Sequence, residues 1–507
     1  MTHRIDHQRA RRLPWMALTM AALAFVPAPE AEAVTIIPGT TITVDTVSDG
    51  FIIIPPWPSP PPPPPCRLRD AIEAANTNQK VGGCPAGKRA RLVSANPTVL
   101  KDVDQIVFDV GTGTPDILLR NALPPITDSV TIDGATGGAT RVEISGENIR
   151  SFFGPVEGVV VTGTFTTLKS LVVNGFSGSG IVLTAEDGDG IVIVTPGRPE
   201  RPDEIPGQLD PCGPKAFPSD PSQCPPPGGF PGDDVTTIGG PGGGSNTVVD
   251  CLVGTNAAGN AIVANGTGLP DSAGIMVLNS GNTIGSVDPK LGNVISGNRG
   301  HGVLLQGVNN HLINNKIGTG ISTSVGLGNE LDGVFVTGGQ FAGATCEILG
   351  NTIFYNHGDG IDAGFNVCTL LANRISGNGE LGIERAEDGV TPNDPTAALH
   401  RRPPNFPEIW RVTMSFGFPQ RTTISGIIHQ RSPDPITVEL FYSSSCDPSG
   451  NGEGASYLGS TQVAFPSPSS TQPAVFSFTT NKIFIAGYYT ATATTEQGTS
   501  EFSVCYR

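Results

Sequence analysis

The sequence predicts an all-β protein whose main body is a stack of parallel β-coils, with a helical N-terminal cap and a C-terminal β-sandwich. Three observations lead to this fold class. Short runs rich in β-branched residues, such as VTIDG, IVLTA and GVLLQG, are separated by glycine and proline, as is typical of strands between turns. A sequence motif repeats in the middle of the chain. One amphipathic helix stands early in the chain, where an open stack of coils needs a cover.

Residues 1–33 have the features of a secretory signal peptide. Four arginines precede an apolar run from Trp15 to Val26, and Ala31-Glu32-Ala33 offers small residues to a signal peptidase. The apolar run is about half of the ~20 residues that a membrane span needs. We therefore expect a secreted or cell-surface protein without a transmembrane segment.

The charge of the chain argues against nucleic acid as a partner. The formal net charge is −16, from 30 basic and 46 acidic residues. Removal of residues 1–33 takes away four basic and three acidic residues, which leaves 26 minus 43, or −17. Such a surface repels phosphate backbones, and no basic cluster with interleaved aromatic residues is present.

Residues 34–100 are predicted to form an N-terminal cap with a polyproline loop and one helix. The segment CRLRDAIEAANTN, residues 66–78, follows the proline run. Its apolar residues recur at helical spacing, while Arg69 and Glu73 lie on the opposite face. The apolar positions are Leu68, Ala71, Ile72 and Ala75.

A repeat of 22 residues predicts the stacked coils of residues 101–395. Asn293 to Asn315 and Asn351 to Asn373 both span 22 residues, and the 36 residues between Asn315 and Asn351 correspond to one coil with an insertion. Each coil is too small to close a core alone, so neighbouring coils must stack through parallel strands. We expect two internal columns, Ile295, Ile317, Ile353 and Ile375, and Val303, Val334, Ile361 and Ile383.

The four repeated asparagines are expected to form a structural ladder at one turn of the coils. Asparagine tolerates left-handed backbone geometry, and its amide can bond to the amide of the next coil. The Pro/Gly-rich insertion at 196–244 interrupts the coils, and its composition predicts a surface loop.

Nine cysteines in an exported chain indicate disulfides with one thiol left over. Proximity in the sequence or in neighbouring coils suggests pairs. Cys251 matches a ladder position and is expected to stay unpaired. The expected pairs are Cys66 with Cys84, Cys212 with Cys224, Cys346 with Cys368, and Cys446 with Cys505.

Several segments resemble a known family. CRLRDAIEAAN, DQIVFDV and ALPPITDSVTIDG are similar to the N-terminal module of secreted bacterial CSLREA-type right-handed parallel β-helix repeat proteins, although Arg67 stands where the family pattern has serine. Residues 403–507 resemble the Ig-like β-sandwich that closes these chains. The resemblance implies a pectin-lyase-like superfold in the periplasm or on the outer surface of a bacterium, and no agreed activity.

The strongest candidate for a catalytic site follows from the positions of polar residues in the repeat. His301, Asp332 and Asp359 occupy equivalent places before a Gly-Val or Gly-Ile strand, and His357 lies close to Asp359. Stacked carboxylates can separate their pKa values and act as acid and base, as in polysaccharide hydrolases. The alternative is that these residues are ordinary polar turn residues, because Leu381 occupies the same place in the next coil.

The function that the sequence favours is non-enzymatic: binding of a glycan or a protein at the cell surface, or a structural role, by a monomeric chain. The competing hypothesis is a polysaccharide hydrolase or lyase. A lyase needs a basic residue to abstract a proton from the sugar, and Lys316 and Arg374 are the only basic residues near the Asp pair, which makes a lyase the weaker alternative. No cofactor is expected. Calcium is an alternative at Asp332 and Asp359 or in the acidic run from Glu186 to Asp189, but a calcium-binding loop motif is missing.

Overall fold

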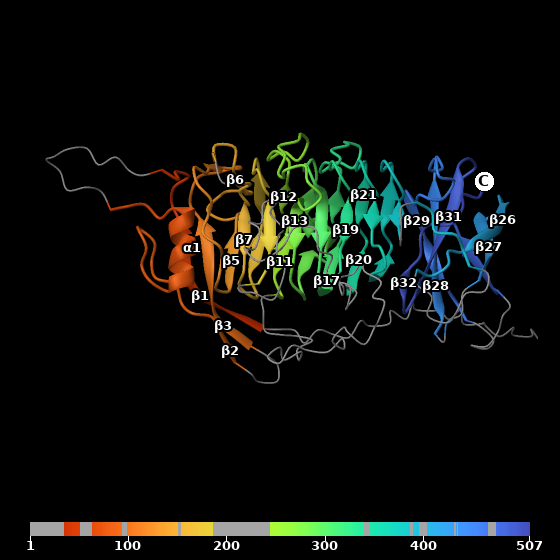
Figure 1. The fold of residues 1–507 in the computed structure, drawn as a ribbon, viewed down its shortest axis with the longest axis horizontal. Helices are drawn as coiled ribbons and strands as arrows, with labels where there is room; N and C mark the ends of the chain where they lie inside the picture. The colour runs from red at the N-terminus through yellow and green to blue at the C-terminus, as the bar shows by residue number, and fades with distance from the viewer. Residues whose placement is uncertain are drawn as a thin grey trace, which may run out of the picture.

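The computed structural model describes residues 35–50, 63–93, 99–150, 154–185, 244–338, 345–385, 389–394, 403–429, 432, 434–464 and 473–507. In these ranges the chain forms three parallel sheets side by side along one long axis, followed by two antiparallel sheets (Figure 1). From residue 130 onward, each turn of the coil adds one strand to each of these sheets, and the strand at residues 91–93 is antiparallel at the edge of the first sheet. The fold class predicted from the sequence, a right-handed parallel β-helix with a C-terminal β-sandwich, is confirmed.

The three parallel sheets supply the faces of the solenoid. The first sheet contains β1 (Thr35–Val44), β2 (Arg91–Val93), β3 (Val99–Phe108), β5 (Val130–Asp133), β8 (Thr167–Lys169), β11 (Thr247–Val249), β14 (Thr283–Gly285), β17 (Val308–Ile313), β20 (Thr345–Leu349) and β23 (Val367–Leu371). The second sheet contains β4 (Asp116–Leu118), β6 (Val142–Ser145), β9 (Leu171–Asn174), β12 (Leu252–Val253), β15 (Val294–Ile295), β18 (Lys316–Ile317), β21 (Thr352–Phe354) and β24 (Arg374–Ser376). The third sheet contains β7 (Val159–Val161), β10 (Ile181–Leu183), β13 (Ala273–Val277), β16 (His301–Leu305), β19 (Val334–Val336), β22 (Ile361–Asp362) and β25 (Ile383–Glu384).

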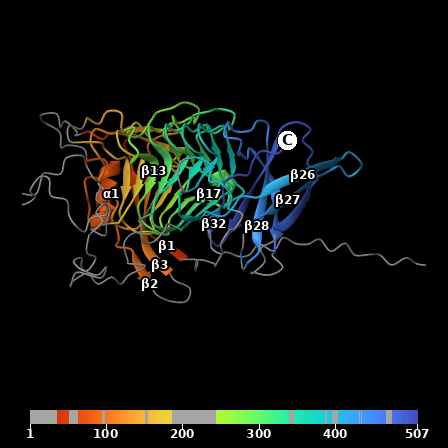
Figure 2. The ribbon, with the colours of Figure 1, turned by 45° about the vertical axis from the view of Figure 1, so that its right-hand side comes forward.

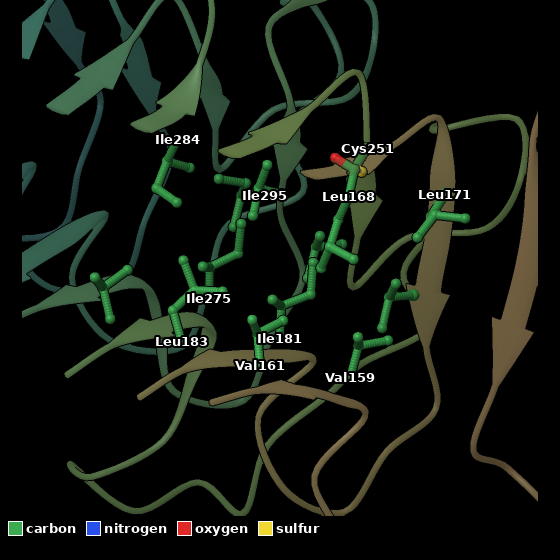
Figure 3. Close-up of a cluster of buried hydrophobic side chains, with 14 of the residues drawn as sticks. Val159, Val161, Leu168, Leu171, Ile181, Leu183, Cys251, Ile275, Ile284 and Ile295 are labelled. Carbon is green, nitrogen blue, oxygen red and sulfur yellow. The ribbon is translucent and has the colours of Figure 1, made fainter. Parts of the chain in front are cut away.

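The core of the solenoid consists of columns of apolar side chains, one residue from each coil. Both predicted columns are present. In the first, strand pairing aligns Ile295, Ile317, Ile353 and Ile375 on successive coils. In the second, it aligns Val303, Val334, Ile361 and Ile383. All members of both columns are buried. In Figure 3, side chains from the three sheets meet in the middle of the coil, with Leu168, Ile181 and Ile275 among them. Burial of these columns is the main favourable contribution to the stack.

The N-terminal end is closed by the helix α1 (Leu68–Thr77). The predicted apolar face is buried against the first coil, and Asn78 ends the helix in the left-handed conformation, with φ 58°. Arg69 does not pair with Glu73. Its guanidinium instead binds the Asp49 carboxylate at 2.6 and 2.9 Å. The sheet begins before the helix, because β1 already pairs in parallel with β3.

Asparagine ladders connect the coils at their turns. Asn293 Nδ2 donates to Asn315 Oδ1 at 2.9 Å, and the same bond links Asn315 to Asn351 and Asn351 to Asn373, at 3.0 Å each. The main-chain N of Cys251 donates to Asn293 Oδ1, so this cysteine occupies the ladder position that its sequence indicates.

Two further ladders have irregular spacing in the sequence. Asn246, Asn282 and Asn310 bond in series at one turn. At another turn, side-chain bonds run through Asn265, Asn298, Asn329, Asn356 and Asn378. All of these amides are buried, and the ladders satisfy polar groups that would otherwise be costly there.

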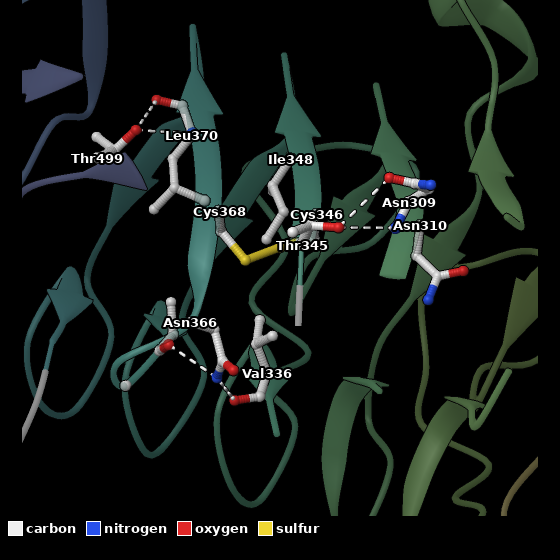
Figure 4. Close-up of a disulfide and its surroundings, with 12 residues drawn as sticks. Asn309, Asn310, Val336, Thr345, Cys346, Ile348, Asn366, Cys368, Leu370 and Thr499 are labelled. Carbon is white, nitrogen blue, oxygen red and sulfur yellow. Dashed lines mark hydrogen bonds between the residues drawn. A yellow bond between two sulfur atoms is a disulfide. The ribbon is translucent and has the colours of Figure 1, made fainter. Parts of the chain in front are cut away.

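Three disulfides occur in the described part of the chain: Cys66–Cys84, Cys346–Cys368 and Cys446–Cys505. Cys346 and Cys368 lie on neighbouring strands β20 and β23, where their Cα atoms are 4.6 Å apart (Figure 4). Cys251 is free and buried. The expected pair Cys212–Cys224 and the expected signal peptide lie outside the described residues. Disulfides fit an oxidising, extracellular compartment.

The C-terminal β-sandwich lies against the last coils and continues the long axis of the molecule (Figure 2). One sheet contains β26 (Glu408–Ser415), β27 (Arg421–Ile428) and β30 (Ala474–Thr480). The other contains β28 (Ile436–Ser443), β29 (Ser456–Val463), β31 (Tyr488–Thr495) and β32 (Gly498–Thr499). The helices of the described ranges lack the length and apolarity that a membrane crossing requires.

Candidate functional site

The predicted stack of His301, Asp332 and Asp359 lies at the turn that leads into the third sheet. The main-chain N of Gly302 donates to the carbonyl of Asp332, and the N of Gly333 donates to the carbonyl of Asp359, both at 2.9 Å. These bonds place the three residues one above another on successive coils. The repeat register therefore brings them together as the sequence suggests.

His301 is held in a defined orientation between two coils. Its ring stacks on Phe335 with the centroids 4.6 Å apart, and its Nε2 lies 3.1 Å from the carbonyl oxygen of Pro270. Its Nδ1 is 3.1 Å from Oδ2 of Asp332. The imidazole is buried, with 5 % of the residue exposed. Both ring nitrogens therefore face oxygen atoms, a carbonyl at Nε2 and a carboxylate at Nδ1.

Asp359 carries the largest electrostatic perturbation of the cluster. Burial, followed by the negative charges of Asp332 and Glu384, raises the pKa of Asp359 to about 8. Its main-chain N donates to Asp332 Oδ1 at 2.8 Å, while its own Oδ1 has no hydrogen-bond partner among the described residues. Loss of hydration disfavours the charged carboxylate. At neutral pH the Asp359 carboxyl is therefore mainly protonated. The neighbouring Asp332 carboxylate accepts the main-chain N–H of Asp359.

Two further acidic residues extend this cluster: Asp362, which the sequence places close to Asp359, and Glu384, which sequence reasoning missed. Asp362 pairs in register with Phe335, and Glu384 pairs with Asp362 on the next coil. Burial is the first cause that raises the pKa of Asp362 to about 6 and that of Glu384 to about 7. The signal was available, because the same register arithmetic that selects Asp359 also aligns Asp362 and Glu384. We call His301, Asp332, Asp359, Asp362 and Glu384 the acidic cluster.

His357 does not join the acidic cluster. It lies at an exposed turn, where its main-chain N donates to the carbonyl of Asn329 at 3.0 Å. In the described residues, no group of three or more His, Cys, Asp or Glu side chains has an arrangement that could hold a metal ion. The acidic run from Glu186 to Asp189, the other calcium alternative, lies outside the described ranges.

A groove of about 580 Å³ lies along the turns between the second and third sheets, and it ends at Arg299, two residues before His301 of the acidic cluster. Four successive turns contribute to it, those that follow β6, β9, β12 and β15. The described residues that line it are Ile149, Arg150, Gly154, Pro155, Ser177, Gly266, Thr267 and Arg299. Sequence reasoning missed this groove, because its residues belong to turns of different length and share no repeat position.

No family model matches the sequence, and no curated protein matches it either. Among solved structures, the enzymatically active domain of tailspike protein 2 of bacteriophage CBA120 is 10 % identical, with a TM-score of 0.24, over 77 % of this chain and 68 % of that chain. The ORF18 protein of Geobacillus virus E2 is 9 % identical, with a TM-score of 0.24, over 86 % and 71 %. The periplasmic alginate epimerase AlgG is 13 % identical, with a TM-score of 0.18, over 60 % and 70 %.

Proposed function

We propose that this protein is an exported member of the CSLREA-type β-helix group that binds an extracellular polysaccharide without cleaving it. The observation that carries the proposal is the groove across four coils. An extended polymer suits a surface to which four successive coils contribute, because each coil can contact the ligand in turn. Strand spacing of about 4.8 Å makes three coil steps about 14 Å long, enough for an extended ligand.

The geometry of the acidic cluster supports a structural role for those residues. His301 and Asp359 are 5 % and 7 % exposed, so a sugar ring cannot reach both of them. The Asp332 carboxylate already accepts the amide of Asp359 and faces His301. These contacts join three coils at one turn and occupy the groups that catalysis would need to present to a substrate.

A panel of soluble plant and bacterial polysaccharides tests the proposal. The mature, oxidised protein is run in native gels that contain one polysaccharide each, and reducing ends are measured in parallel incubations. We expect retarded migration with at least one polysaccharide and no rise in reducing ends. The absence of binding across the panel, by gel and by calorimetry, would contradict the proposal.

A hydrolase is the second candidate function, and one observation favours it. Asp359 is protonated at neutral pH while Asp332 lies beside it, which is the division into acid and base that glycoside hydrolysis requires. The discriminating variant is Asp359→Asn. If the wild-type protein releases oligosaccharides and Asp359→Asn reduces the release by about a hundredfold or more, the hydrolase is correct and the non-enzymatic proposal is wrong.

A further inference from the structure

The groove between the second and third sheets is basic at both ends, on a protein that is strongly acidic. Arg150 follows β6 and Arg299 follows β15, so the two arginines belong to the first and last of the four contributing turns. No acidic residue appears among the described lining residues. The chain as a whole has a formal charge of −16. This concentration of positive charge is therefore local.

Both guanidinium groups are available to a ligand. Arg150 and Arg299 are exposed, and neither forms an ion pair with another residue in the described ranges. Arginine keeps its charge at every physiological pH, and its planar fork matches the two oxygens of a carboxylate. By comparison, Arg141 is engaged by the Asp250 carboxylate, and Arg91 by Asp102.

The backbone under the groove is fixed by one of the asparagine ladders. Asn265 and Asn298 are fully buried, and the first donates its side-chain amide to the second at 3.1 Å. Each directly precedes a groove residue, Gly266 or Arg299. The main-chain N of Arg299 also donates to the carbonyl of Asn265 at 2.7 Å. The ladder thus sets the position from which the Arg299 side chain leaves the turn.

Acidic groups surround the groove but do not line it. A Cβ built on Gly268 would lie 4.0 Å from the Glu330 carboxylate. The Glu157 carboxyl packs against Gly178, and burial raises its pKa. Among the described lining residues, the two guanidinium groups are the only charged side chains.

We propose that the ligand of this groove is an acidic polysaccharide, whose carboxylates pair with Arg150 and Arg299. This inference rests on the proposed polysaccharide binding and adds the chemical class of the ligand. The two turns lie three coil steps apart, about 14 Å along the axis, so two acidic sugars of one extended chain can be held together. Each pair is a charge-assisted, two-point contact of the kind that arginine makes with carboxylate.

The test compares ligands of matched backbone and different charge. The mature protein is titrated calorimetrically with polygalacturonate, with its methyl-esterified form, with a sulfated polysaccharide and with double-stranded DNA. We expect the carboxylated polymer to bind, the esterified polymer to bind at least tenfold more weakly, and added salt to weaken binding. Arg150→Gln and Arg299→Gln should each weaken binding about tenfold, and the double variant about a hundredfold.

A matched control separates this site from general charge effects. Arg421→Gln removes an exposed arginine from the β-sandwich, and we expect unchanged affinity. Thermal unfolding of the groove variants should match wild type, because exposed side chains are replaced. Equal binding of esterified and free polygalacturonate, unaffected by the double variant, would overturn the inference and leave the proposed function standing. A preference for the sulfated polymer or DNA over carboxylate would also overturn it, whereas binding of no polysaccharide would refute the proposed function itself.

Discussion

The two ends of the solenoid are closed in different ways. At the N-terminal end, the ten-residue helix α1 covers the first coil with an apolar face, and the Cys66–Cys84 disulfide lies beside its start. At the C-terminal end, a complete β-sandwich fills the same role (Figure 1). Its Phe441 and Phe502 pack into the main core of the β-helix. Both ends remove apolar surface from water, and both supply side-chain acceptors to backbone donors: Asn76 of α1 accepts the main-chain N of Thr127 at 2.9 Å, whereas glutamates do so at the C-terminal end.

Glutamates of the sandwich accept hydrogen bonds from donors of the last coil. Glu453 accepts the main-chain N of Gly377 at 2.5 Å and that of Asn378 at 3.2 Å, and it also accepts the Asn378 side chain. It therefore ends the ladder that runs from Asn265. Glu439 accepts the main-chain N of Ala372 at 3.0 Å. An open ladder has a donor left over at one end, and the sandwich supplies a carboxylate for it.

Other contacts continue the strand pairing between the two parts. Ile375 and Gly454 exchange two main-chain hydrogen bonds, at 3.0 and 2.9 Å. The hydroxyl of Thr499 accepts the main-chain N of Leu370 at 2.8 Å, close to the Cys346–Cys368 disulfide (Figure 4). The sandwich is thus the C-terminal cap of the solenoid as well as a second domain.

Among the variants that compare the two ends, Glu453→Ala should cause the largest loss of stability. It leaves three buried donors without an acceptor, so we expect the free energy of unfolding to fall by about 4 kcal/mol. Denaturant unfolding of the oxidised protein measures this. Glu453→Gln keeps one acceptor and should cost less, and Asp434→Asn at an exposed position should be neutral. If Glu453→Ala loses no more free energy of unfolding than the Asp434→Asn control, the ladder does not need a terminal acceptor.

Replacement of the N-terminal disulfide should give the next largest effect. The double variant Cys66→Ala, Cys84→Ala opens a loop of 18 residues, for which chain entropy predicts a loss of about 3 kcal/mol. Unfolding curves of the variant and of wild type provide the measurement. Because this loss arises from the chain entropy of the unfolded state, it should not depend on pH in the window described next. A pH-dependent loss would contradict the entropic origin.

The last expected effect is a pH dependence of stability to which carboxyls at the C-terminal end contribute. Burial raises the pKa of Glu439, Glu501 and Glu384 to about 7, from a reference value of 4.5. A carboxyl whose folded pKa is raised contributes stability that is present below the unfolded pKa and lost as pH rises through the folded pKa. Stability should therefore decline as the pH rises from 4.5 through 7.

Thermal unfolding at a series of pH values tests this decline. Glu439→Gln should flatten part of the curve, because the amide carries no charge at any of these pH values. The matched control is Asp434→Asn, which should keep the wild-type slope. Stability that rises over the same pH range would show that the interface carboxylates are stabilised in their charged form, against the stated desolvation argument.

Regular spacing made much of the fold predictable. The 22-residue interval between asparagines was enough to align Ile295 with Ile317 and Ile353 with Ile375, because each coil must place one apolar residue in the same column. The ladder from Asn265 to Asn378 was missed, since its members are separated by 33, 31, 27 and 22 residues. Turns of variable length hide a position that is equivalent in space.

The same distinction holds for the candidate sites: the stacked residues share a repeat position, and the groove arginines do not. His301, Asp332 and Asp359 precede strands of equal register, so their stacking could be predicted from the sequence. Their burial could not, because it depends on packing around the turn, and burial is the main cause of the raised pKa of Asp359. The groove arginines gave no periodic signal, since they lie on turns of unequal length.

The sequence by itself determined the repeating part of this protein: short strands, stacked coils, inward columns and a helix that covers one end. Local periodicity is enough for these features, because each coil obeys the same steric and hydrophobic rules as its neighbours. Only the tertiary structure decided how the last coil is closed, which carboxyls are buried, and that Arg150 and Arg299 share one groove. Those features depend on contacts between segments far apart in the chain, for which sequence spacing carries no information.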